Sequence, residues 1–359
     1  MYFVNTGLDE CIVQFLEKSY PGTVATQVWV NQTKDGKKAH MTTVYKKPDE
    51  PTRHAKHSKF VNPKANFFNV KTKQVYTFDQ VKNYYDGLPK DKRHGFENFI
   101  KTNYFVSDGK STTSETYKKP DHTYTYTRFN MVHKPIIDKI VSSVDSPPDG
   151  MKPVAVLIGG GAGSGKSTVI SSIVKPFMDS TGLKFANMDC DELKPLLPEF
   201  PMFLQENPKS AYSRVHRESS DLCGECLDVL MKQSKCFMFS GIMGDAQRTK
   251  GMIDKLNKLG YEVHLVCIDV PIDLAISRAS KRDRFMSDSI ITTSHRKFAS
   301  AFNQLFNYPG VSSCELYDNS QPPGQPPTLI MDQSGVHNQT LYNNFMKKSK
   351  EGLYHGYNR

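Results

Sequence analysis

One glycine-rich stretch has the residue types and the spacing needed to bind a nucleoside triphosphate. Residues 160–167 read Gly-Gly-Ala-Gly-Ser-Gly-Lys-Ser, which matches the phosphate-binding pattern G-x-x-x-x-G-K-[ST]. Glycines there let backbone N–H groups curl around phosphate oxygens that bulkier side chains would obstruct. We expect Lys166 to reach the β- and γ-phosphates and the Ser167 hydroxyl to ligate Mg²⁺. The expected nucleotide site is Gly160, Gly161, Ala162, Gly163, Ser164, Gly165, Lys166, Ser167 and Thr168.

The flanking residues place this loop between a strand and a helix. The run from Val154 to Ile158 is apolar and mostly β-branched, which predicts a buried strand. Ser167 to Lys175 has the apolar spacing of a helix, and Pro176 is expected to end it. The N-terminus of that helix would add partial positive charge at the phosphates. A flexible glycine linker is the alternative interpretation, and the strand, the helix, the Lys and the Ser argue against it.

Two aspartates follow the next predicted strand, which spans residues 185–188. Asp189 and Asp191 lie two apart, so in an extended segment their side chains would share a face. Carboxylates at the carboxyl end of a strand beside a phosphate loop face the crevice that holds nucleotide and Mg²⁺. Phosphoryl transfer needs metal support and a group that accepts the proton of the acceptor hydroxyl. The alternative is that one aspartate caps a helix starting at Glu192, and both roles can coexist.

A third stretch carries several cations. Arg278, Lys281, Arg282 and Arg284 follow a predicted helix that begins near Ile272. Arginines in that position can fold over the triphosphate and offset the charge that spreads over the transferred phosphoryl group. The alternative is a solvated basic helix end that interacts favourably with the helix dipole.

The net charge of +10 is spread unevenly over the 359 residues. Residues 1–150 hold 23 basic against 16 acidic side chains, and within them residues 51–100 hold 10 against 4. This basic segment is a candidate contact for nucleic acid or a protein partner, or else a solubilising surface. No apolar run is long enough to span a membrane. With no secretion signal and seven scattered cysteines, we expect a cytoplasmic protein with reduced thiols.

The break Ser-Pro-Pro-Asp-Gly at 146–150 is taken as a linker between two domains. Residues 1–145 are expected to form a smaller basic α+β domain. Its expected elements are a helix at 1–20, a hairpin of 24–30 with 39–45, a basic loop at 46–68, helices at 78–85 and 94–103, a strand at 122–129 and a helix at 134–144.

Residues 151–359 alternate strands and helices, which implies parallel βαβ units. Further strands are expected at 237–240, 261–269, 315–317 and 329–331, and further helices at 211–232, 246–259, 294–306 and 340–350. The predicted fold class is α/β, a mostly parallel sheet flanked by helices.

The motifs in residues 151–317 together resemble the zeta-toxin family of P-loop kinases. The resemblance rests on the glycine loop with Lys166-Ser167, the D-x-D-E-L-K…LLP segment at 189–198, a helix near 215–220 and the GYEV…DVP…A..RA..R run at 260–282. Members characterised as toxins phosphorylate UDP-N-acetylglucosamine with ATP or GTP. By that resemblance Asp191 is the catalytic base, and Arg278 with Arg282 or Arg284 clamps the phosphates. Asp189 then joins Ser167 as a metal ligand.

One residue departs from the family pattern. Where such kinases commonly end the third strand in Glu-Gly-Thr, this chain has Ser240-Gly241-Ile242. A carboxylate that would contact the sugar is therefore absent, which affects the expected acceptor more than the expected chemistry.

Two function classes follow. The first is a Mg²⁺-dependent kinase that uses ATP or GTP and a small-molecule acceptor such as a nucleotide sugar, or a nucleic-acid end reached through the basic segment. The second is a non-catalytic nucleotide-binding interaction protein. Retention of Lys166, Ser167, Asp189, Asp191 and the arginines together favours the kinase.

Overall fold

The computed structural model describes residues 24–32, 39–46, 53–61, 65–69, 72, 74–89, 92–93, 95–107, 109–281 and 286–351. Contacts divide the chain into two compact units. The first comprises residues 1–134 and 195–218, and the second comprises residues 135–194 and 219–359. The predicted linker at 146–150 contains neither helix nor strand. The expected 1–20 helix lies outside the described residues, as do Arg282 and Arg284.

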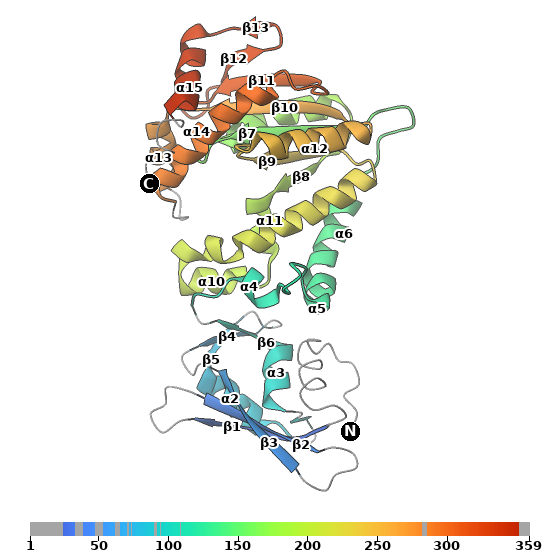
Figure 1. Cartoon of the computed structure of the whole chain (residues 1–359), viewed down its shortest axis with the longest axis vertical. Helices are drawn as coiled ribbons and strands as arrows, with labels where there is room; N and C mark the ends of the chain where they lie inside the picture. Colours follow the sequence, from blue (N-terminus) through green and yellow to red (C-terminus); the bar gives the residue numbers. More distant parts are fainter. Residues whose placement is uncertain are drawn as a thin grey trace. The chain divides into compact units, whose positions relative to one another are not determined.

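The second unit is built on a seven-stranded sheet with the order β13-β12-β11-β10-β7-β9-β8 (Figure 1). The five strands from β11 to β8 are parallel, and the two at the other edge are antiparallel. The predicted α/β class is confirmed. The strands are β7 (Val154–Gly160), β8 (Ala186–Asp189), β9 (Phe237–Gly241), β10 (Glu262–Asp269), β11 (Ser313–Asp318), β12 (Thr328–Asp332) and β13 (Gly335–Val336).

Helices cover both faces of this sheet, which explains why β7 is apolar along its whole length. Val156 and Ile158 face a cluster that includes residues of the segment after the loop, α7 (Lys166–Val169), η3 (Ile170–Val174) and α8 (Lys175–Ser180). On the other face α12 (Ala246–Lys258) and α14 (Asp288–Leu305) lie side by side (Figure 1). The remaining helices are α6 (Lys134–Ser142), α9 (Cys190–Leu193), η4 (Lys194–Leu196), α13 (Ile272–Ser280) and α15 (Gln339–Glu351).

The helix after the loop does not end at Pro176, so that expectation was wrong. The backbone N–H of Lys175 bonds to the carbonyl of Ile170, five residues back, which makes η3 a π turn. The wider turn accommodates the proline ring, which in an α-helix would meet the carbonyl four residues earlier. A second π turn, η2 (Phe129–His133), precedes Pro135 in the same way, and there the N–H of Lys134 bonds to the carbonyl of Phe129.

The first unit contains two antiparallel three-stranded sheets with the orders β1-β2-β3 and β5-β4-β6. Phe67, Phe78 and Tyr104 pack in an aromatic core beside the second sheet. The elements are β1 (Val24–Gln32), β2 (Ala39–Lys46), β3 (Arg53–Val61), β4 (Asn66–Asn69), β5 (Val75–Thr77), α2 (Phe78–Gly87), α3 (Phe96–Asn103), β6 (Tyr104–Ser107), α4 (Thr113–Tyr117), α5 (Tyr126–Arg128), η2, α10 (Phe200–Glu206) and α11 (Pro208–Lys232), which continues into the second unit.

For this unit the predicted hairpin and the predicted helices at 78–85 and 94–103 were confirmed, the helices as α2 and α3, and two other expectations were wrong. The predicted hairpin forms as β1 and β2. The predicted loop at 46–68 instead contains β3 and β4. Backbone pairing with β2 and β6 forms these two strands, which the polar sequence alone does not predict. The predicted strand at 122–129 is reduced to a single bridge from Tyr124 to Lys118, and helix begins at Tyr126, where the Thr125 hydroxyl accepts the N–H of Arg128 and caps α5. In the described residues no helix is long and apolar enough to cross a membrane.

Candidate active site

The glycine loop follows β7 at the carboxyl edge of the sheet. Beside β7 the order of the strands reverses, with β9 and β8 on one side and β10 and β11 on the other. Such a switch point is where open α/β sheets bind ligands. Gly163 and Gly165 have φ values of 78° and 79°, which L side chains rarely adopt. A Cβ atom at Gly163 would also come 2.5 Å from the carbonyl oxygen of Ala275. The loop conformation therefore requires glycine at both positions.

Three side chains from distant segments hold the loop, and sequence reasoning missed all of them. The Ser294 hydroxyl accepts the N–H of Ala162 at 2.9 Å. His295 Nε2 donates to the Ala162 carbonyl at 2.9 Å. Asn319 Nδ2 donates to the carbonyls of Ser164 and Gly165, at 2.9 and 3.1 Å. The sequence offered a signal only for Asn319, which directly follows a strand and so had to lie at the carboxyl edge.

The polar side chains of the loop differ in what they contact. Lys166 Nζ donates to the carbonyl of Gly160 at 3.0 Å. Ser167 and Thr168 are exposed at the start of α7. The Ser164 hydroxyl is buried and has no hydrogen-bond partner among the described residues. An N-terminal helical turn with exposed hydroxyls and glycine-rich backbone before it suits an anion with several oxygens.

Arg278 brings an unsatisfied cation to this loop. Its Nη1 is buried and lacks a hydrogen-bond partner among the residues that the structure describes. A Cβ atom at Gly165 would lie 3.3 Å from the same nitrogen. A buried donor without a partner costs about 1–3 kcal/mol, which an anionic ligand would remove. Arg278 is thus the predicted arginine that the structure brings to the loop.

The two aspartates do not share a face, so that expectation was wrong. The chain turns helical at Cys190, and Asp189 Oδ1 caps α9 by accepting the N–H of Asp191 at 2.8 Å. The capping alternative therefore holds for Asp189. Asp191 is exposed, and its Oδ1 accepts a 2.6 Å bond from Lys194 Nζ. Lys194 is only 1% exposed and fixes the orientation of this carboxylate.

Ser240 occupies the neighbouring strand at the same edge. It pairs in register with Asp189 on β8 and with Ile158 on β7, so it lies between the aspartate segment and the loop. Its hydroxyl is buried without a hydrogen-bond partner in the described part of the chain. Ser240 thus places a short polar side chain where zeta-toxin kinases commonly have a glutamate.

Cys190, between the two aspartates, contacts a second thiol. A hydrogen bond from Cys223 lowers the pKa of Cys190, and burial opposes this effect. The same contact, together with burial, raises the pKa of Cys223. Cys223 and Cys226 both lie on α11 as free thiols with buried side chains.

The first unit contains a buried ionic cluster that the sequence did not reveal. Arg128 donates to both carboxylates of Glu199 and Glu218, at 2.6 to 3.0 Å. His133 Nε2 lies 2.8 Å from Glu218, and the Tyr117 hydroxyl donates to Glu199. Burial raises the pKa of Glu218, but hydrogen bonds from His133 and Arg128 outweigh burial and bring it to about 2. The cluster is internally satisfied, which favours a structural role.

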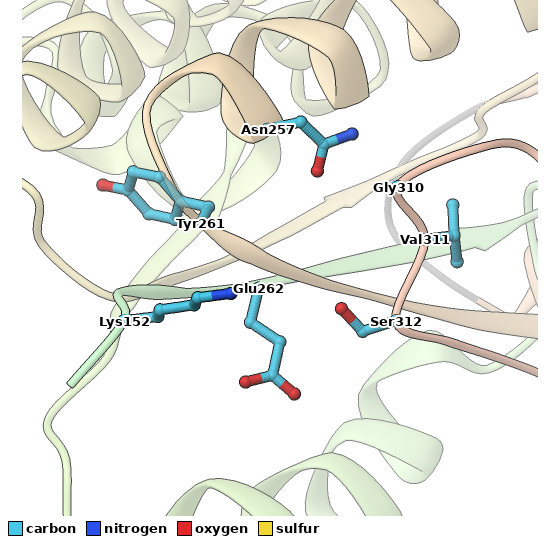
Figure 2. Close-up of a pocket in the computed structure, with 7 residues that line it drawn as sticks. All are labelled: Lys152, Asn257, Tyr261, Glu262, Gly310, Val311 and Ser312. Atoms are coloured by element: carbon cyan, nitrogen blue, oxygen red, sulfur yellow. The ribbon is translucent and has the colours of Figure 1, made fainter.

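A polar pocket of about 430 Å³ lies away from this site (Figure 2). Its lining comes from residues at the amino ends of β7, β10 and β11, the edge opposite the glycine loop. Lys152, Tyr261, Glu262 and Ser312 line it.

Known proteins match both the sequence and the fold. The Zeta toxin family profile matches residues 138–318, half of the chain. A crystal structure of AvrRxo1-ORF1 with AvrRxo1-ORF2 and sulphate ions is 15% identical, with a TM-score of 0.54 over 67% of this chain and 83% of that chain. The same complex with ATP gives 0.52, at the same identity and coverage. The PezAT toxin–antitoxin structure from Streptococcus pneumoniae gives 0.47 at 16% identity, over 63% and 88%.

The two AvrRxo1 matches, with TM-scores above 0.5, establish a shared fold. No curated protein sequence matches the chain. The family profile contains the glycine loop, the aspartate segment and α13 with Arg278. The chain belongs to the zeta toxin family.

Proposed function

We propose that the chain is a phosphotransferase that moves the γ-phosphate of ATP or GTP to a hydroxyl of a small-molecule acceptor. The observation that carries this proposal is the buried Nη1 of Arg278 beside Gly165 of the glycine loop, which has no hydrogen-bond partner within the described part of the chain. A loop that binds an anion needs backbone donors, whereas transfer also needs cations at the charge that develops. Family membership and the fold shared with an ATP-bound complex support the same reading.

The donor side follows from the loop. Backbone N–H groups and the helix N-terminus bind the phosphates, and Lys166 leaves the carbonyl of Gly160 to reach the β- and γ-oxygens. Arg278 binds the γ-phosphoryl oxygens, with Arg282 or Arg284 as the expected second cation. These groups hold the phosphoryl group in line with the acceptor.

The residues present fit one Mg²⁺ ion. The described residues contain no group of three His, Cys, Asp or Glu side chains that could hold a metal by itself. Mg²⁺ in kinases is instead held by one or two protein oxygens, nucleotide phosphates and water. Ser167 is exposed at the helix start, and Asp189 keeps Oδ2 beside the capping Oδ1, so these two would hold it. When bound, the ion neutralises charge on the β- and γ-phosphates.

Asp191 is the proposed base on the acceptor side. It is exposed, so an acceptor hydroxyl can reach it, and Lys194 holds one of its oxygens in place. This carboxylate then accepts the proton of that hydroxyl. A nucleotide sugar is the acceptor that the family suggests, and Ser240 leaves room and a hydroxyl where a carboxylate would otherwise contact the sugar.

The test is an acceptor screen with γ-labelled ATP and GTP. Wild type is incubated with separate pools of nucleotide sugars, other small molecules and nucleic-acid ends, with Lys166→Ala as the blank. Arg278→Gln should weaken transfer by about 10- to 150-fold, the worth of one charge-assisted hydrogen bond. Arg248→Gln, an exposed arginine on α12, is the matched control. Equal transfer by Arg278→Gln and wild type would contradict the proposed role of Arg278.

One alternative has an observation in its favour. The short Ser240 and its unpartnered hydroxyl suit a site that binds nucleotide without transferring it, as in an interaction protein. Tight nucleotide binding with no labelled product from any pool would favour that reading. For a nucleic-acid end, the basic segment at 51–100 predicts affinity that falls steeply with salt, and a flat response would exclude it.

A further inference from the structure

The carboxylate of Asp269 is buried close to the glycine loop. It ends β10, is 5% exposed, and pairs in register with Asp318 on β11, a second buried carboxylate. Two neighbouring buried carboxylates are costly unless a cation or hydrogen bonds compensate them. Asp318 is bonded by the hydroxyl of Ser320. Asp269 depends on Lys348, whose Nζ lies 2.6 and 2.7 Å from its two oxygens.

Asp269 is linked to the glycine loop by two routes. His295 Nδ1 lies 3.9 Å from Asp269 Oδ1, while Nε2 of the same ring donates to the carbonyl of Ala162. The ring packs so closely that a Cβ atom at Gly161 would lie 2.3 Å from its Cδ2. On the second route the Asn319 N–H donates to the Asp269 carbonyl, and the Asn319 side chain holds the carbonyls of Ser164 and Gly165.

Lys348 comes from α15, which lies outside the stretch matched by the family profile. Phe345, one turn earlier, packs edge-on against Phe298 and Phe302 of α14, the helix that also carries His295. Lys348 is buried and also donates to the carbonyl of Val270 at 2.7 Å. Its neighbours Lys347 and Lys350 are exposed. Of these lysines, Lys348 alone is directed to the sheet edge that holds the nucleotide site.

We propose that Lys348 is a positioning residue of the nucleotide site, acting through Asp269. By neutralising that carboxylate it keeps His295 and Asn319 in the geometry that holds the glycine loop open for phosphate. Without the ammonium, a buried carboxylate has to find another donor. The ring nitrogen His295 Nδ1 lies 3.9 Å from Asp269 Oδ1. For Nδ1 to donate, the neutral ring has to carry its proton there and not on Nε2, and the bond to the Ala162 carbonyl is then lost. The C-terminal helix is thus a part of the donor site, an inference that rests on nucleotide binding by the loop.

The test compares ATP affinity of the full chain with that of Lys348→Met, with Lys350→Met as the matched control. The expected dissociation constant rises about fivefold or more in Lys348→Met, the lower range of coupling between linked sites. Lys350→Met is expected within about twofold of wild type, as for an ordinary surface change. Circular dichroism and thermal unfolding verify that each variant is folded. Should Lys348→Met not fold, Lys348→Gln takes its place. Its amide can still donate to Asp269 without neutralising it, so a smaller rise in the dissociation constant is expected, and a value equal to that of wild type overturns the proposal.

The double variant Asp269→Asn/Lys348→Met separates positioning from packing. With no buried carboxylate left to satisfy, and an amide beside His295, its affinity should return to within about twofold of wild type, as for an ordinary substitution. If Lys348 contributed packing alone, the double variant would bind no better than Lys348→Met. Wild-type affinity in Lys348→Met would overturn the proposal, as would a double variant no better than the single one. Failure of wild type itself to bind ATP would instead refute the proposed function.

Discussion

Substitution of Gly165 by alanine tests how the glycine loop is held. The residue has a φ of 79°, and a Cβ atom there would lie 2.3 Å from Asn319 Nδ2. The left-handed conformation costs an L residue roughly 1–2 kcal/mol. The displaced Asn319 amide would also give up its bonds to the carbonyls of Ser164 and Gly165, at about 0.5–1.5 kcal/mol each. Together these terms predict a loss of about 2–5 kcal/mol of unfolding free energy.

Gly260 provides a control that separates the two terms. Its φ is 80°, but nothing lies within 4 Å of a Cβ atom built there. Gly260→Ala should therefore cost only the conformational term of roughly 1–2 kcal/mol. Denaturant unfolding of both variants gives the difference, expected to be about 1–3 kcal/mol. ATP titration should show binding about tenfold or more weaker for Gly165→Ala, the equivalent of 1.4 kcal/mol, and unchanged for Gly260→Ala.

Equal losses of unfolding free energy and equal ATP affinities in the two variants would refute the predicted role of Asn319. If Gly165→Ala and Gly260→Ala lose the same unfolding free energy and bind ATP equally, Asn319 does not support the loop. If Gly165→Ala is destabilised further yet binds ATP as wild type does, Asn319 supports the fold without shaping the phosphate site.

Three further outcomes are expected. Asp191→Asn should lower labelled phosphate transfer by about 10²–10⁴-fold with unchanged ATP affinity, and undiminished transfer would remove Asp191 as the base. The pKa of Glu218 is about 2 in the folded chain, below its ordinary value of 4.5. The stability that Glu218 contributes is therefore present above pH 4.5 and lost as pH falls toward 2, and the pH-dependent slope of unfolding free energy in that window should disappear in Glu218→Gln. Because its pKa is lowered and it is only half-buried, Cys190 should react with iodoacetamide before Cys236, which peptide mass spectrometry detects; the opposite order would contradict the Cys223 contact.

The parts of the site that local sequence defines were predictable. The strand, glycine loop and helix around Lys166 follow from a contiguous pattern, and the structure has all three. The residues that support the loop come from far along the chain, and no local pattern marks them. Ser294 and His295 read as ordinary positions of a helix. Lys348 reads as one of several lysines in a basic helix, and only the packing of Phe345 turns it inward.

The wrong expectations also have physical causes. β3 is basic and lacks the alternation of a half-buried strand, so only its pairing with β2 reveals it. We expected Asp189 and Asp191 to lie in one extended segment. Instead, Asp189 caps α9, which begins at Cys190, two residues before Glu192.

The π turn after the glycine loop fixes the length of this part of the chain. A π turn holds one residue more than an α-helical turn, so it is equivalent to a single inserted residue that the helix absorbs. Removal of one residue from 170–174 would restore the α-helical ladder and leave the residues after it in phase. The Pro176 ring would then meet the carbonyl of the residue four positions before it. A relative that lacks one residue here should therefore lack the proline as well.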